Sequence, residues 1–94
     1  MVIRLMNDYG ADWPLWEDGL LPQGEPAVPP ELEGRLLAWA DGFGRFRWET
    51  GWDTVAERDH HVREGEALLV ALQAALPDHE IVLDLWETDV RSEE

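Results

Sequence analysis

Hydrophobic and polar residues alternate in three short stretches of this 94-residue chain. In residues 2–7 (VIRLMN), Ile3 and Leu5 fall on one side and Arg4 on the other, and residues 45–49 (RFRWE) and 80–87 (EIVLDLWE) follow the same pattern. A two-residue repeat in a short run rich in β-branched and aromatic residues is typical of a half-buried strand. The pattern therefore predicts three strands.

Apolar residues with helical spacing fill residues 29–44. Leu32, Leu36, Ala40 and Phe43 recur every three or four positions, and the stretch opens with prolines that suit a first helical turn. Glycines at 42 and 44 favour a stop. We expect one helix here.

A second helix is expected from Val55 to Leu76, between a capping-box pair formed by Thr54 and Glu57 and the proline at position 77. Its predicted buried stripe follows a seven-residue repeat, made of Val55, Val62, Leu69 and Leu76 with Gly65 and Leu72 between them. The missing side chain at Gly65 predicts a bulky neighbour over that position, such as a tryptophan.

Residues 8–29 hold four prolines and three glycines, which interrupt regular structure, so a long loop is expected there. Trp13 and Trp16 lie inside this loop. We interpret them as anchors that pin the segment onto the body. The alternative is that they contact a partner, ringed by the carboxylates of Asp12, Glu17 and Asp18.

The predicted order is β-α-β-α-β, an α/β fold with a small three-stranded sheet, two helices on one face and the long Trp/Pro loop after the first strand. The chain is expected to be a single domain over residues 1–94, with a flexible tail over residues 88–94. The sheet face toward the helices would carry Ile3, Leu5, Phe46, Trp48, Ile81, Leu83 and Leu85. The opposite face would carry Arg4, Arg47, Asp84 and Trp86 among others.

The net charge of the chain restricts the possible partners more than any other feature of the composition. The formal net charge is −14, from 21 acidic and 7 basic residues, and every cation is arginine. Direct binding of nucleic acid needs a basic face, so it is not expected, whereas a basic protein partner is favoured. No apolar run is long enough for a membrane span or a signal peptide, and no cysteine is present, which suits a cytoplasmic protein.

Candidate catalytic chemistry is sparse. Ser92 is the only serine and lies in the tail, so no serine nucleophile with a partnering base is apparent. Glu57 and His60 have a spacing found in carboxylate-bridged metal sites, but a single such motif is best interpreted as part of a solvated helix face, with His61 nearer its flank. We therefore expect no catalytic residue, metal or cofactor.

Four short motifs carry a resemblance. DYG at 8–10, PLW at 14–16, LLAWAD at 36–41 and FRWE at 46–49 are similar to segments of uncharacterised, short, acidic proteins of high-GC bacteria. The resemblance covers about the first half of the chain. It implies one domain of this design and no particular activity.

The preferred hypothesis is a non-catalytic acidic module that binds a basic protein surface, as an immunity protein, an antitoxin-like inhibitor or an accessory subunit does. The candidate partner-binding residues are Asp12, Trp13, Trp16, Glu17, Asp18, Arg47, Asp84 and Trp86. One alternative is a small anion-binding or enzymatic domain that uses the Arg4, Arg47, Asp84 and Trp86 face. Another is a homodimer that buries this face. A deep polar cavity with converging histidines and carboxylates would contradict the preferred hypothesis.

Overall fold

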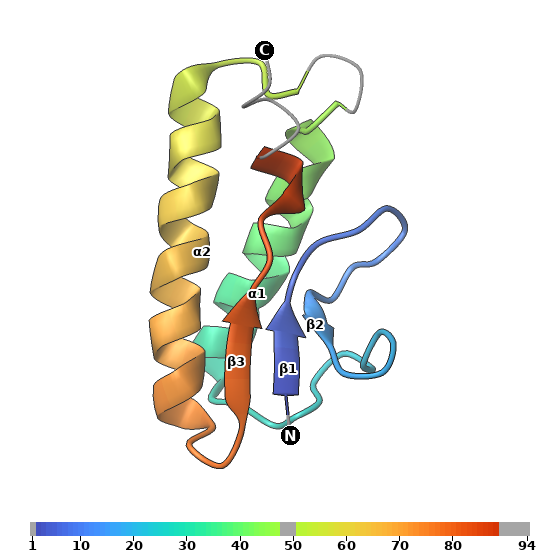
Figure 1. Cartoon of the computed structure of the whole chain (residues 1–94), viewed down its shortest axis with the longest axis vertical. Coiled ribbons are helices and arrows are strands. Elements are labelled where there is room, and N and C mark those ends of the chain that lie inside the picture. Colours follow the sequence, from blue (N-terminus) through green and yellow to red (C-terminus); the bar gives the residue numbers. More distant parts are fainter. Residues whose placement is uncertain (1, 48–50, 89–94) are drawn as a thin grey trace.

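The computed structural model describes residues 2–47 and 51–88 (Figure 1). The elements are β1 (Val2–Leu5), β2 (Leu15–Trp16), α1 (Pro30–Gly42), the 3₁₀ helix η1 (Phe43–Arg45), α2 (Val55–Ala75) and β3 (Glu80–Leu83). The three strands form one sheet, and the two long helices lie beside and behind it (Figure 1). The predicted α/β class, with three strands, two helices and a long loop after the first strand, is confirmed.

The sheet has the order β2-β1-β3. β1 pairs with β3 in parallel, with Ile3 opposite Ile81, and with β2 in antiparallel, with Leu5 opposite Leu15. These inward side chains are buried together with apolar residues of both helices, as the alternation predicted. The outward side chains Val2 and Val82 stay 53% and 40% exposed, so this face of the sheet is open in the described structure.

The middle strand is not where the sequence predicted it. Residues 43–45 form η1 directly after α1, and Arg47 makes an isolated antiparallel bridge with Gly51 instead of joining the sheet. The place beside β1 is taken by β2, from within the loop expected to lack regular structure. Two residues suffice there because the Pro14 carbonyl accepts from Met6 N–H at 2.9 Å. The element order is therefore β-β-α-α-β; predicted residues 48–49 lie outside the described residues.

The last strand is shorter than predicted. It ends at Leu83 because the Asp84 carboxylate accepts from the Trp86 backbone N–H at 3.1 Å, which turns the chain into a helical turn over residues 86–88. Thr88, expected to begin a flexible tail, is 6% exposed and donates to the Leu85 carbonyl at 2.8 Å. The rest of that predicted tail lies outside the described residues.

Helix α2 buries only part of the predicted seven-residue stripe: Gly65, Leu72 and Leu76 are buried, whereas Val62 and Leu69 are half-buried. Val55 is 62% exposed, and the buried positions before the helix end are His61, Gly65, Leu68 and Leu72. Their spacing of four, three and four residues marks one helical face. The bulky neighbour expected at Gly65 is confirmed: a Cβ there would stand 3.0 Å from Cζ2 of Trp39.

The long loop is tied to the body by its tryptophans. Trp13 is 2% exposed and its indole donates to the Glu25 carbonyl at 3.1 Å, while the Trp16 indole donates to the Met6 carbonyl at 2.9 Å. Both act as anchors in this structure, as the sequence favoured. No helix among the described residues is long and apolar enough to cross a membrane.

Candidate recognition cleft

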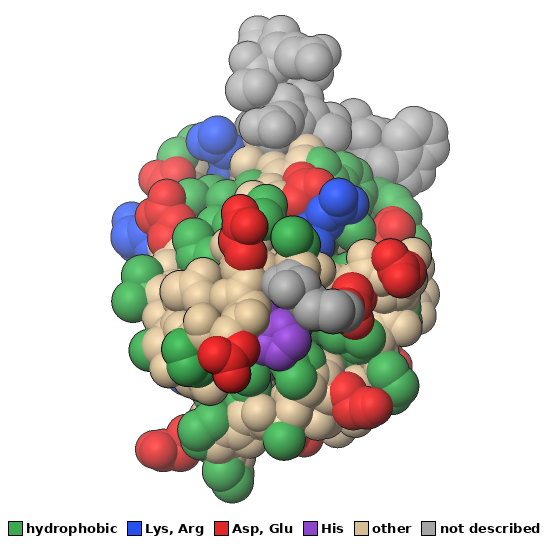
Figure 2. All heavy atoms as spheres, turned by 60° about the horizontal axis from the view of Figure 1, so that its bottom comes forward, with side chains coloured by type: hydrophobic (Ala, Val, Ile, Leu, Met, Phe, Trp, Pro, Cys, Tyr) green, Lys and Arg blue, Asp and Glu red, His purple; other side chains and the backbone are tan. Residues whose placement is uncertain are grey.

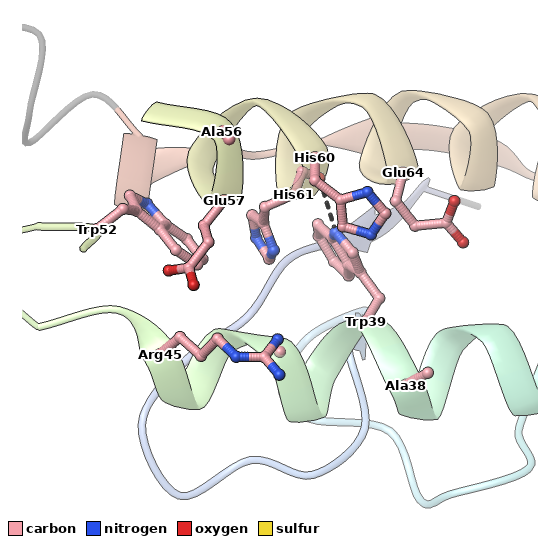
Figure 3. A pocket seen from close by; sticks show the side chains of 10 residues that line it. Ala38, Trp39, Arg45, Trp52, Ala56, Glu57, His60, His61 and Glu64 are labelled. Atoms are coloured by element: carbon pink, nitrogen blue, oxygen red, sulfur yellow. Dashed lines mark hydrogen bonds between the residues drawn. The ribbon is translucent and has the colours of Figure 1, made fainter. Parts of the chain in front are cut away.

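A cleft of about 430 Å³ opens between the end of α1 and the first half of α2 (Figure 3). Helix α1 and its continuation contribute side chains from one side, α2 contributes them from the other, and Trp52 closes one end (Figure 3). We call it the α1–α2 cleft; its lining residues are Ala38, Trp39, Gly42, Arg45, Trp52, Ala56, Glu57, His60, His61 and Glu64.

Aromatic rings form the base of the α1–α2 cleft. The His61 imidazole stacks on Trp39 with ring centroids 4.7 Å apart, and it contacts Trp52 in a tilted arrangement with centroids 4.6 Å apart. The Trp39 indole donates to the His61 backbone carbonyl at 2.9 Å, which fixes α1 against α2 at this level. Ring stacking and this hydrogen bond hold the base of the cleft in one arrangement.

A buried polar cluster, Asn7–His61–Glu87, supports this base. His61 Nε2 donates to Glu87 Oε2 at 2.6 Å, and Asn7 Nδ2 lies 3.4 Å from the same oxygen. All three residues are almost fully buried, with Glu87 at 0% exposure. Within the described part of the chain, Asn7 Oδ1 and Glu87 Oε1 are buried with no hydrogen-bond donor. A histidine–carboxylate pair of this kind fixes the ring orientation, because a buried polar group needs its partner.

Trp52 is held in place by a second apolar cluster, separate from the core between helices and sheet. This aromatic cluster consists of Phe43, Phe46 and Trp52, with Trp86 packed against it. The Trp86 indole donates to the Asn7 backbone carbonyl at 2.7 Å. This hydrogen bond links the aromatic cluster to the buried polar cluster, of which Asn7 is a member. The irregular segments on either side of residues 48–50 are therefore part of the cleft architecture.

Glu57 lies in the cleft wall with an unusual side-chain arrangement. The capping box predicted at the start of α2 is half formed: the Thr54 hydroxyl accepts from Glu57 N–H at 3.0 Å. The Glu57 carboxylate points toward α1, into the cleft (Figure 3). Its Oε1 is buried, and no described residue donates to it.

The other charged groups of the cleft reach solvent. Arg45 is exposed, and its guanidinium extends along the α1 side of the opening (Figure 3). Glu64 accepts from the Arg35 guanidinium at 3.2 Å, with side-chain exposures of 30% and 44%. An ion pair this exposed contributes little to stability. The buried surface inside the cleft is formed by the aromatic rings and the Glu57 carboxylate.

The cleft gathers the histidines and carboxylates that the sequence assigned to a solvated helix face. His60 is exposed, as that interpretation predicted, whereas His61, expected near the flank of this face, is only 4% exposed and packs against Trp39 of α1. Among the described residues, no three histidine or carboxylate side chains are grouped closely enough to hold a metal ion. The described lining residues include no hydroxyl or thiol nucleophile.

The candidate partner-binding residues of the loop differ in how deeply their side chains are buried. Asp12, Glu17 and Asp18 are exposed and Trp16 is half-buried, whereas Trp13 belongs to the core. The carboxylates of this loop therefore form an accessible acidic surface above a buried anchor.

The face proposed for anion binding is not assembled. Arg4 lies on β1 opposite Val82, whereas Arg47 follows η1 and forms an exposed ion pair with Asp53 at 3.7 Å. Trp86 packs on the aromatic cluster, and Asp84 is used to turn the chain. The prediction that these residues share one sheet face was wrong because residues 45–47 do not form a sheet strand.

Sequence reasoning missed the residues that build the cleft: Asn7, Trp39, Trp52, His61 and Glu87. One signal was available, since His61 precedes Gly65, Leu68 and Leu72 at helical spacing. The repeat counted from Val55 included Gly65 and Leu72 of this face but not His61 or Leu68. Glu87 and Asn7 contact His61 although they are 26 and 54 residues away from it in the sequence. A local sequence pattern cannot predict contacts over such separations.

The surface reflects the acidic composition. On the face seen in Figure 2, Asp and Glu side chains are spread among apolar and backbone atoms, and the arginines lie in its upper part. With a formal net charge of −14, the molecule presents a negative field to any partner.

Comparison with known proteins gave one family. A family model described as Serratia CdiI immunity protein-like matches residues 1–83. No curated protein and no solved structure matches the chain. The matched region includes α1, α2, the three strands and every described residue that lines the cleft.

Proposed function

Because the chain belongs to the Serratia CdiI immunity protein-like family, we propose that it neutralises a cognate CdiA-type toxin domain by binding it in the cytoplasm, without catalysing a reaction. The family match across residues 1–83 carries this proposal. An open, largely aromatic cleft and an exposed acidic loop are features of a recognition surface, on which a few aromatic and charged residues dominate affinity.

We propose further that the toxin surface is basic. The net charge of −14 would attract such a surface over a distance set by the ionic strength, and would accelerate association. The loop carboxylates Asp12, Glu17 and Asp18 are exposed and stand above rigid tryptophan anchors. They are the best-placed group for contacts at the rim of the interface.

The test is calorimetric binding to a purified CdiA-type toxin domain, together with growth of cells that express this toxin domain with and without the protein. We expect a tight 1:1 complex and restored growth. Absence of binding together with absence of protection would overturn the proposal. A 2:2 complex by light scattering would instead support the homodimer alternative, for which the open sheet face with Val2 and Val82 offers exposed apolar side chains.

Charge is tested separately by repeating the titration at low and high salt. We expect affinity to fall as salt rises, and Glu17→Gln with Asp18→Asn to reduce the association rate by roughly threefold to tenfold. The matched control is Asp78→Asn with Glu80→Gln, two exposed carboxylates, one in the turn before β3 and one at its first residue. An affinity that is independent of salt would contradict a basic partner and leave the immunity function standing.

A further inference from the structure

We infer that the α1–α2 cleft receives the cationic end of a lysine or arginine side chain from the toxin domain, with the Glu57 carboxylate as its ion-pair partner. This inference rests on the proposed function and specifies the contact through which it acts. Four features of the cleft lead to it.

The first is the unsatisfied oxygen. Glu57 Oε1 is buried from solvent, and no donor from the described residues reaches it. Buried polar atoms in folded proteins are nearly always paired, and leaving an acceptor of an ionised group unpaired is unfavourable. The cleft beside this carboxylate is open, so a donor arriving from outside can supply the missing hydrogen bond.

The second is the half-formed capping box. A glutamate three residues after an N-cap threonine commonly returns to the N-cap backbone N–H. Here Thr54 accepts from the Glu57 N–H, but the carboxylate is turned toward α1 (Figure 3). The side chain therefore forms part of the cleft wall instead of closing the capping box.

The third is the shape and chemistry of the lining. A volume of about 430 Å³ lies within the range of pockets that bind small ligands. Ala38 and Ala56 leave room for a long aliphatic stem, and the rings of Trp39 and Trp52 flank the interior (Figure 3). Methylene groups pack well on such rings, and tryptophan is the side chain that attracts a nearby cation most strongly.

The fourth is the balance of charge inside the opening. Arg45 also lines the cleft, but it is exposed, so water already solvates its guanidinium. Glu64 is paired with Arg35, and His61 with Glu87. Among the described lining residues, Glu57 thus carries the charged atom that is shielded from water without a partner. Charge complementarity favours a cation over an anion as the occupant.

The experiment compares toxin-domain affinities of three single variants with that of the wild-type protein. Glu57→Gln keeps the shape and removes the charge, so we expect affinity to fall tenfold or more. Arg45→Ala removes the competing cation, and we expect equal or tighter binding. Glu66→Gln, an exposed carboxylate on the same helix, is the matched control and should change affinity less than twofold. Thermal unfolding confirms that all three variants are folded.

Two patterns would overturn the inference while leaving the immunity function intact. If Arg45→Ala weakens binding and Glu57→Gln strengthens it, the occupant is a carboxylate. If wild-type protein binds the toxin domain and neither change matters, the cleft lies outside the interface.

Failure of the wild-type protein to bind the toxin domain is the failure of the proposed function, and it is a different result. In that case the cleft is titrated with agmatine, observed through the indole N–H signals of Trp39 and Trp52 by NMR. Saturable shifts that disappear in Glu57→Gln would support a cation site; absence of shifts would overturn it.

Discussion

Two regions of this small protein bury their side chains by different means. Between helices and sheet, Leu5, Leu36, Leu68 and Leu72 are completely buried in an apolar core. The second region lies around the α1–α2 cleft. There the aromatic cluster packs beside the buried pair of His61 and Glu87 and borders the open cleft.

Stability and recognition depend on different regions of the protein. Apolar contacts are non-directional, so the helix–sheet core gains its stability from the area that it removes from water. The polar cluster depends on particular partners at particular distances, and it fixes the rings that form the base of the cleft. We expect changes in the core to alter stability alone, and changes around His61 to alter stability and toxin binding together.

The largest effect is expected in the helix–sheet core. Leu68→Ala should lower the free energy of unfolding by about 2–5 kcal/mol, because it removes buried methyl groups and leaves a cavity. Val70 on the same helix is 70% exposed, so Val70→Ala should change the free energy of unfolding by less than about 0.5 kcal/mol. Urea unfolding measures both. Equal effects of the two substitutions would show that the buried face of α2 is assigned wrongly.

A smaller loss is expected from the polar cluster. Glu87→Gln keeps the size of the side chain but replaces a charge-assisted hydrogen bond of 2.6 Å, so unfolding should become easier by about 1.5–3 kcal/mol. Toxin affinity should fall with it, because His61 supports both tryptophans of the cleft. The control is Glu80→Gln, an exposed carboxylate on β3. Unchanged affinity in a folded Glu87→Gln protein would separate the polar cluster from recognition.

The smallest effects are expected from a matched pair of helix glycines, and they differ in sign. At Gly65 an added Cβ stands 3.0 Å from Trp39, whose ring is held by its hydrogen bond and by stacking on His61. Gly65→Ala should therefore destabilise by about 1 kcal/mol, since overpacking exceeds the gain in helix propensity. At Gly34 a Cβ meets nothing within 4 Å, so Gly34→Ala should stabilise by about 0.5–1 kcal/mol. A stabilising Gly65→Ala would show that Trp39 is free to move.

The same contrast explains what the sequence predicted. Periodic apolar residues placed β1, α1, α2 and β3, and identified Ile3, Leu5 and Ile81 as the inner face, because these elements bury one regular face. The gap at Gly65 even indicated its tryptophan neighbour. Local patterns are reliable where burial is apolar and repetitive.

The cleft could not be predicted in the same way. Phe46 and Arg47 alternate like a strand, but Phe46 packs in the aromatic cluster and β2 occupies the place beside β1. Glu87 continues an alternating strand pattern, yet the turn made by Asp84 carries it to His61. These positions are decided by contacts between distant segments, and alternation is only a local signal.

The most direct test of the account is an NMR titration of the wild-type protein with the cognate toxin domain, followed through the six tryptophan indole N–H signals. We expect the largest shifts at Trp39 and Trp52, in the cleft, and little change at Trp13, which is 2% exposed in the core. Saturating binding that leaves Trp39 and Trp52 unshifted would contradict the account.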